Sequence, residues 1–300
     1  MALICDVQYG EGTTGFDLSK VGVTGVRKPI VLTRPGINSP ESSVLVCSFD
    51  ILVDLPARQR GSHLSRNVEV LREVAEESYD KKFSNLEDVA AEMVDRLLVK
   101  HEYAVNVYVD VTAEYFRPAK TPSGRSTTEF YTLIAGAVGH RGKKTVRKIG
   151  AAATGMTACP CAQQTVGEIL AVQPDFPMMS HNQRNTCRIV IEHSDDAVID
   201  ADDLIDMAER SVSSATFELL KREDEGRVVI SAHTNTRFVE DVVRNGLTQI
   251  VSNCKDLSDD ARIHVSSDSE ESIHKHNAYA ERKATMGDLR QEYAKKIKAE

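Results

Sequence analysis

The sequence lacks any long hydrophobic run. No stretch of its 300 residues approaches the roughly 18–20 apolar residues that a membrane-spanning helix needs, and the N-terminus lacks the basic-then-apolar plan of a signal peptide. These absences argue against a membrane partner and predict a cytoplasmic protein. In that reducing compartment, the six cysteines are expected to be buried thiols or metal-binding and catalytic groups rather than disulfides.

An excess of basic residues is also absent. The chain has 37 Lys and Arg against 45 Asp and Glu, a net charge of −8. Nucleic-acid binding needs clustered Lys and Arg, so no nucleic-acid partner is expected. A few basic residues that converge locally can still bind an anionic small molecule, so a nucleotide substrate remains open. The hydrophobic content of 41% is that of a globular protein, and 300 residues are enough for two domains.

Two segments have clear periodicity. Ser84-Asn-Leu-Glu87 fits a capping box and is followed by apolar residues at helical spacing, which predicts a helix. Residues 103–112 alternate between apolar and polar side chains, which predicts a half-buried strand. Weaker patterns predict strands at 45–55, 127–136, 143–151, 187–192 and 263–266, helices at 68–79, 201–221 and 238–251, and a surface helix or frayed end at 278–300.

The predicted elements occur twice in the same order, as strand, paired helices and strands. This order favours an α+β fold in which antiparallel sheets carry paired helices on one face. We expect a first module at residues 1–155 and a second at residues 156–300. The two halves share no clear sequence repeat.

Three polar clusters could carry chemistry, although each has a plain structural alternative. Cys159-Pro-Cys161 could be two incidental cysteines in a turn, because one residue between thiols is too close for a complete zinc knuckle. The tetrad His181-Asn-Gln-Arg184, 22 residues beyond Cys159, could be a polar surface loop. The third cluster contains His274 and His276, and the carboxylates Glu225 and Glu240 could be ordinary acidic surface.

In conjunction, these clusters resemble the type IB GTP cyclohydrolases, and within them the archaeal branch. The resemblance covers nearly the whole chain, and its motifs occur in the same order. They are Val21-Gly-Val-Thr-Gly-Val-Arg-Lys28, Ser48-Phe-Asp-Ile-Leu-Val-Asp54, Arg60-Gly-Ser-His-Leu-Ser-Arg66, Cys159-Pro-Cys161, His181-Asn-Gln-Arg184, Leu219-Leu-Lys-Arg-Glu-Asp-Glu225, Arg237-Phe-Val-Glu-Asp241 and Glu271-Ser-Ile-His-Lys-His276.

The resemblance implies tandem tunnelling-fold modules and a homo-oligomer, dimer or tetramer, with sites at subunit interfaces. It implies that the second module carries most of the metal site. Fe(II) is the implied metal, with Zn(II) or Mn(II) as substitutes, and Cys161 is expected to be a packing or supporting thiol. The implied ligands are Cys159, His181, Glu225 and one of His274 and His276.

The implied reaction opens the purine ring of GTP with release of formate and gives 7,8-dihydroneopterin 2′,3′-cyclic phosphate, the first step of methanopterin biosynthesis. Catalysis would depend on Cys159 as ligand and on His274 or His276 to move protons, and Glu240 would bind the guanine edge. The residues expected to bind the rest of the substrate are Arg60, His63, Arg66, Gln183 and Arg184.

Two alternatives accompany this interpretation. A bacterial-type enzyme would make 7,8-dihydroneopterin triphosphate for folate, and a non-catalytic relative would only bind a purine or pterin. The archaeal branch is favoured because Ala162-Gln163 follow Cys-Pro-Cys where the bacterial pattern has Ser-Lys, and because the insert before His181 is longer.

Overall fold

The computed structural model describes residues 8, 14–34, 41–80 and 83–297, which fold into two compact units. The first unit comprises the described residues up to Glu114 together with Ile134–Ile149, and the second comprises Tyr115–Leu133 together with the described residues from Gly150 on. Three strands contribute residues to both units: β3 (Asn106–Lys120), β4 (Ser126–His140) and β5 (Val146–Ala158). The predicted module boundary at residue 155 stays a prediction.

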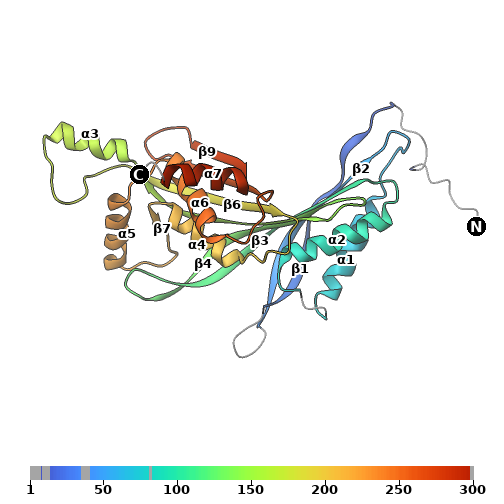
Figure 1. The fold of residues 1–300 in the computed structure, drawn as a ribbon. Helices are drawn as coiled ribbons and strands as arrows, with labels where there is room; N and C mark the ends of the chain where they lie inside the picture. The colour runs from blue at the N-terminus through green and yellow to red at the C-terminus, as the bar shows by residue number, and fades with distance from the viewer. Residues whose placement is uncertain (1–7, 9–13, 35–40, 81–82, 298–300) are drawn as a thin grey trace, which may run out of the picture. The chain divides into compact units, whose positions relative to one another are not determined.

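The first unit places two helices against antiparallel strands (Figure 1). β1 (Leu18–Arg34) pairs with β2 (Glu41–Leu55), and β2 pairs with β3. Helices α1 (Leu64–Glu77) and α2 (Leu86–Lys100) pack on each other. The core is formed by fully buried side chains from these elements, among them Phe49, Ile51, Val53, Val74, Met93, Leu97 and Val107.

The second unit repeats this plan with its own strands and helices. β6 (Asn182–His193), β8 (Arg262–Glu270) and β9 (Ala278–Thr285) are antiparallel neighbours, and α4 (Ala201–Ser211) and α6 (Val239–Asn253) pack together over them. α7 (Met286–Ile297) contacts α6 and β9, and the short β7 (Ser214–Ala215) pairs with β5. The core includes Ile189, Ile191, Leu204, Ile205, Ile250, Ile263 and Val265.

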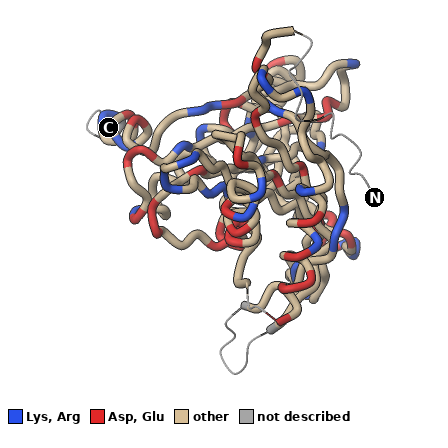
Figure 2. The backbone as a smooth tube through the Cα atoms, turned by 90° about the vertical axis from the view of Figure 1, so that its right-hand side faces the viewer, with Lys and Arg blue, Asp and Glu red and all other residues tan. Residues whose placement is uncertain are grey.

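The strands are hydrogen-bonded in the order β1-β2-β3-β4-β5-β6-β8-β9. In both units, helices cover one face of antiparallel strands, so the predicted α+β class is confirmed. No helix in the described segments is long and apolar enough to cross a membrane. Acidic and basic residues alternate along the backbone instead of separating into regions of one sign (Figure 2).

The two clearest periodic patterns are confirmed with small changes in their boundaries. α2 follows the predicted capping box, but Asn85 and not Ser84 is the cap, because its Oδ1 accepts the Asp88 backbone N–H at 2.8 Å. β3 buries alternate residues from Val107 to Ala113, as the predicted strand requires.

Two other predicted elements need correction, and further elements of the structure were not predicted. β1 was not predicted, since its alternation is interrupted by a bulge at Gly25, which has φ +67° and donates its N–H to Asp50 Oδ1 at 2.8 Å. The predicted helix 201–221 ends at Ser211, because the chain turns there to pair β7 with β5. α5 (Arg222–Thr234) then follows as a separate helix. The first part of the expected tail helix is instead β9, which pairs with β8.

The predicted fate of the cysteines is largely confirmed for those that the structure describes. Cys47, Cys159, Cys161, Cys187 and Cys254 are free thiols, and Cys5 lies outside the described residues. Burial raises the pKa of Cys47 and of Cys187 to about 12, so both are inert packing groups. Cys161 is exposed, so it is not a packing thiol within this chain, and its role as a supporting thiol stays a prediction.

Candidate active site

Cys159 lies at the junction between β5 and α3 (Pro160–Leu170). It is the N-cap of α3, and its Sγ accepts the Ala162 backbone N–H at 3.4 Å. Pro160 begins the helix, where its fixed φ is favourable and its missing N–H is not needed. The partial positive charge at a helix N-terminus stabilises a thiolate. Local sequence thus places a half-buried thiol in a position that favours metal binding or nucleophilic chemistry.

The fold brings His181 next to Cys159. The Cys159 N–H donates to the His181 carbonyl oxygen at 3.1 Å, and the Ser180 hydroxyl donates to the Cys159 carbonyl oxygen at 2.6 Å. These contacts exist because the end of β5 and the residues just before β6 lie side by side. The two polar clusters that the sequence separates by 22 residues therefore lie side by side in the structure.

The imidazole of His181 faces the side chain of Gln183. Gln183 donates its Nε2 to Thr157 Oγ1 at 3.3 Å, and its Oε1 lies 2.9 Å from Nδ1 of His181. This arrangement suits the tautomer with its proton on Nδ1, in which the lone pair on Nε2 is available to a ligand. A histidine whose second nitrogen is held in this way is typical of a metal ligand.

Glu271 is the site residue that was not selected from the sequence. Its Oε2 lies 3.8 Å from Nδ1 of His181, its Oε1 accepts the Ser269 hydroxyl at 3.0 Å, and its side chain is only 10% exposed. The signal was present, because Glu271 begins the motif that contains His274. The adjacent Glu270 differs, since it is exposed and faces Arg184 at 3.5 Å across the β6–β8 pair.

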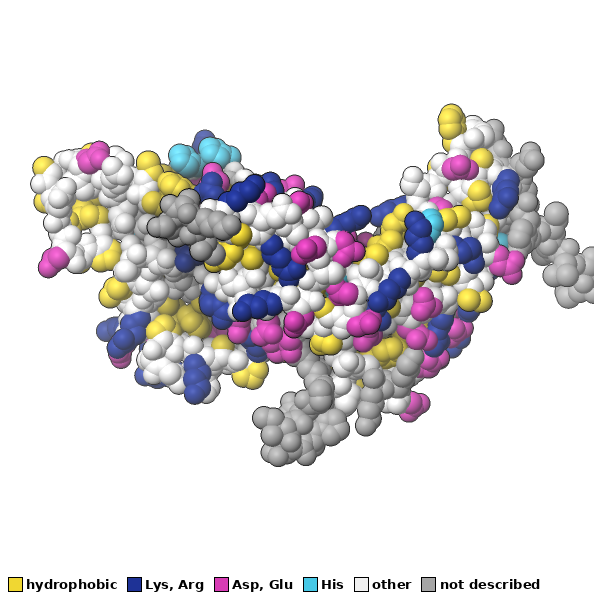
Figure 3. All heavy atoms as spheres, in the orientation of Figure 1, with side chains coloured by type: hydrophobic (Ala, Val, Ile, Leu, Met, Phe, Trp, Pro, Cys, Tyr) yellow, Lys and Arg dark blue, Asp and Glu magenta, His cyan; other side chains and the backbone are white. Residues whose placement is uncertain are grey.

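The two candidate histidines lie near this group. The rings of His181 and His274 are 6.4 Å apart and nearly perpendicular, whereas His274 and His276 stack at 5.1 Å. Both His274 and His276 are exposed, and histidine side chains form a group on the molecular surface in Figure 3. The position of His274 between the other two rings makes it the nearer partner of His181.

The other predicted residues of the second unit, Glu225 and Glu240, lie on helices. Glu225 is exposed in the first turn of α5, next to Asp224, which anchors the helix by accepting the Ser123 N–H at 2.8 Å. Glu240 is exposed in the first turn of α6. The segment before α6 is tied to the strand end that precedes Cys159, because the Arg237 N–H donates to the Ala158 carbonyl oxygen at 3.0 Å.

Within the described part of a single chain, no three His, Cys, Asp or Glu side chains are close enough together to hold a metal ion. Cys159, His181, Glu271 and His274 therefore do not form a complete metal site within one chain, and the full ligand set stays a prediction.

The remaining predicted substrate residues lie in the first unit. Arg60 is exposed, whereas His63 is buried at the N-cap of α1. Arg66 donates Nη1 to the Lys100 carbonyl oxygen at 2.7 Å, which satisfies the C-terminal end of α2. Arg60 is thus the most accessible of these three basic groups.

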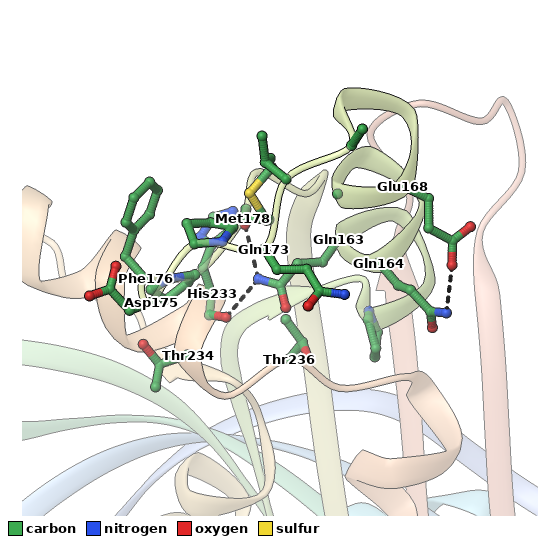
Figure 4. Close-up of a pocket in the computed structure, with 16 residues that line it drawn as sticks. Gln163, Gln164, Glu168, Gln173, Asp175, Phe176, Met178, His233, Thr234 and Thr236 are labelled. Atoms are coloured by element: carbon green, nitrogen blue, oxygen red, sulfur yellow. Dashed lines mark hydrogen bonds between the residues drawn. The ribbon is translucent and has the colours of Figure 1, made fainter.

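A cavity of about 1080 Å³ opens beside the Cys159 end of α3 (Figure 4). It is lined by α3, by residues 171–178 and by the end of α5. Gln163 lies in its wall, with its side-chain amide directed toward the Met178 and His233 backbones. The cavity therefore lies between α3 and residues 171–178, beside the end of α5.

Residues 4–280 match the model of the family described as "Type I GTP cyclohydrolase folE2". The chain belongs to this family. Its predicted resemblance to the GTP cyclohydrolases is thereby confirmed, and so is its enzyme class at the level of the family.

Two curated relatives are similar over nearly their whole length. GTP cyclohydrolase MptA of Methanothermobacter thermautotrophicus is 41% identical, covering 97% of this chain and 97% of its own. GTP cyclohydrolase MptA 1 of Methanocella arvoryzae is 40% identical, covering 96% of this chain and 95% of its own.

Among solved structures, the uricase from Arthrobacter globiformis superposes with a TM-score of 0.52 at 8% identity, covering 89% of this chain and 93% of that one. At this identity the likeness shows the fold alone. It confirms the predicted tunnelling fold.

Proposed function

We propose that this chain opens the purine ring of GTP, releases C8 as formate and forms 7,8-dihydroneopterin 2′,3′-cyclic phosphate, the first step of methanopterin biosynthesis. The observation that carries the proposal is the convergence of Cys159 and His181 at the β5–α3 junction. Family membership supports the substrate, and the similarity to the MptA relatives supports the archaeal product.

The residues present fit a metal of the Fe(II) or Zn(II) type. A thiolate at a helix N-terminus, an imidazole with a free Nε2 and nearby carboxylates form a mixed donor set that suits these ions. We propose Fe(II), with Zn(II) or Mn(II) as substitutes, held by Cys159, His181, Glu225 and His274 or His276. The chemistry that such an ion supplies when bound is to lower the pKa of water toward neutrality for attack on C8.

The side chains of this chain bind and orient the substrate. The exposed Glu240 carboxylate would accept hydrogen bonds from the guanine N1–H and the exocyclic amine, a bidentate contact. The exposed guanidinium groups of Arg60 and Arg184 would meet the phosphate charge, with Gln183, His63 and Arg66 in support. His274 or His276 would transfer protons, since an imidazole can both accept and donate a proton.

A second copy of this chain would complete the site. α3 has no buried residue, and large apolar side chains on and near α3 and α5 are exposed: Ile169, Leu170, Phe176, Met179, Val229 and Ile230. Contiguous exposed apolar side chains are typical of protein interfaces. We therefore propose a homo-oligomer, dimer or tetramer, in which ligands from neighbouring chains meet.

The test is anaerobic incubation of the purified chain with GTP and Fe(II), followed by measurement of formate and by mass spectrometry of the pterin. We expect formate and a pterin with one phosphorus atom. Three phosphorus atoms would indicate the bacterial-type triphosphate product, and absence of formate would overturn the proposed activity in favour of a binding protein.

Cys159→Ala and Cys161→Ala form a matched pair for the same assay. We expect Cys159→Ala to lower turnover at least 100-fold while the far-UV circular dichroism is unchanged. Cys161→Ala should keep activity, because that thiol is exposed. Equal activity of the two variants would contradict the role of Cys159.

A further inference from the structure

The segment between Cys159 and His181 is held by hydrogen bonds and not by a core. α3 contributes no buried side chain, and residues 171–181 are half-buried or exposed. A short helix without packing is marginal in water, so other contacts must fix its position. Hydrogen bonds of buried or half-buried polar groups are the contacts that could fix the position of α3.

Gln163 makes the contacts that join this segment to its surroundings. Its Nε2 donates to the Met178 carbonyl oxygen at 2.9 Å and to the His233 carbonyl oxygen at 2.8 Å (Figure 4). Its backbone N–H donates to the Cys159 carbonyl oxygen at 3.2 Å. One residue thus connects the cap of α3, the chain that leads to His181 and the end of α5.

Ser180 and His233 add further contacts to the same hydrogen-bond network. The Ser180 hydroxyl donates to the Cys159 carbonyl oxygen at 2.6 Å. Nε2 of His233 lies 3.3 Å from the Ser180 carbonyl oxygen, so the end of α5 holds the residue before His181 as well. The position of His181 relative to Cys159 therefore depends on a ring of contacts that includes Gln163.

We infer that Gln163 is a positioning residue that sets the separation of the Cys159 thiol and the His181 imidazole. It acts by holding the Met178–His181 segment and the end of α5 against the first turn of α3. The inference rests on the proposed function, in which these two side chains bind the metal. Gln163 itself would bind neither the metal nor the substrate.

The chemistry of the amide supports a positioning role over substrate binding. A glutamine amide has two N–H donors, and both are used here by backbone carbonyl oxygens. The side-chain amide of Gln164, the next residue, donates to Glu168 Oε1 at 2.9 Å on the exposed side of α3. The two adjacent glutamines therefore form a matched pair with different expected roles.

The test compares Gln163→Ala and Gln164→Ala in the full chain by titration with Co(II) under anaerobic conditions. The thiolate-to-metal charge-transfer absorption reports whether Cys159 binds the ion. We expect Gln163→Ala to bind Co(II) about tenfold more weakly, as is typical when support of a ligand is removed, and Gln164→Ala to match the wild type.

Two controls keep the result interpretable. Gln163→Glu keeps the size of the side chain but removes both donors, so it should weaken Co(II) binding as Gln163→Ala does, and thermal melting confirms that each variant folds. Wild-type affinity in both Gln163 variants would overturn the inference. Absence of the absorption band in the wild type, or a band that Cys159→Ala leaves unchanged, would instead overturn the proposed metal site, and the role of Gln163 with it.

Discussion

Helices α2 and α3 begin alike and are held in place differently. Each has a side chain that caps its first turn, Asn85 Oδ1 for α2 and Cys159 Sγ for α3. α2 buries eight residues, whereas α3 buries none. The hydrophobic effect therefore fixes α2, and hydrogen bonds to distant backbone groups fix α3. The helix that carries the reactive group is the one that contributes least to the core.

The largest difference in stability between variants of α2 and α3 should come from truncation of one apolar side chain on each helix. Leu97 is fully buried on α2, and Ile169 is 76% exposed on α3. We expect Leu97→Ala to lower the free energy of unfolding by about 3 kcal/mol, because it leaves a cavity. Ile169→Ala should change it by less than about 0.5 kcal/mol. Urea unfolding at low protein concentration measures both, and similar losses would refute the comparison.

The C-terminal end of α2 should also make stability depend on pH. Burial, together with the smaller effect of the nearby positive charges of Arg66, His63 and Lys100, lowers the pKa of its C-cap residue His101 to about 4. The neutral ring is fully buried between Asn67 Oδ1, 2.7 Å from Nε2, and Tyr103 Oη, 2.9 Å from Nδ1.

Between pH 6.5 and pH 4, the unfolded chain takes up a proton at His101 that the folded chain does not. The free energy of unfolding should therefore fall as the pH falls through this window. We expect a shallower fall for His101→Gln, which has no titrating ring. Urea unfolding at a series of pH values checks this, and parallel curves for the two proteins would contradict it.

The smallest expected effect concerns the cap of α2. Asn85→Ala should lower the free energy of unfolding by about 1 kcal/mol, because the Asp88 N–H loses its partner. Ser84→Ala is the matched control, since Ser84 is exposed and was the cap that the sequence predicted. Thermal melting measures the stability of both variants. A larger loss of stability for Ser84→Ala than for Asn85→Ala would show that Ser84 is the cap, as the sequence predicted.

Much of the fold was predictable where the pattern was local. α2 and β3 followed from the spacing of their apolar residues, and so did α6. β9 was missed because the consecutive charged residues Glu281, Arg282 and Lys283 interrupt any apolar alternation, and only pairing with β8 makes the segment a strand. α5 was missed because it buries few residues and has no clear apolar face.

The candidate site was also predictable from the sequence only in part. Cys159, His181 and His274 were selected from their motifs, and the structure places them in one region. Glu271 was not separated from Glu270 by sequence, because the two adjacent residues have the same side chain and differ only in where the fold places them. The register of β6 with β8 leaves Glu270 exposed opposite Arg184, whereas Glu271 lies beyond the end of β8 beside His181.

The sequence by itself determined the chemistry of the site and the position of the strongest elements, because side-chain type and periodicity are local properties. Only the tertiary structure decided how Cys159 and His181 are held together. Gln163 does so through the carbonyl oxygens of Met178 and His233. Every residue has such a carbonyl group, so a contact of this kind leaves no pattern in the sequence and becomes visible only when the chain has folded.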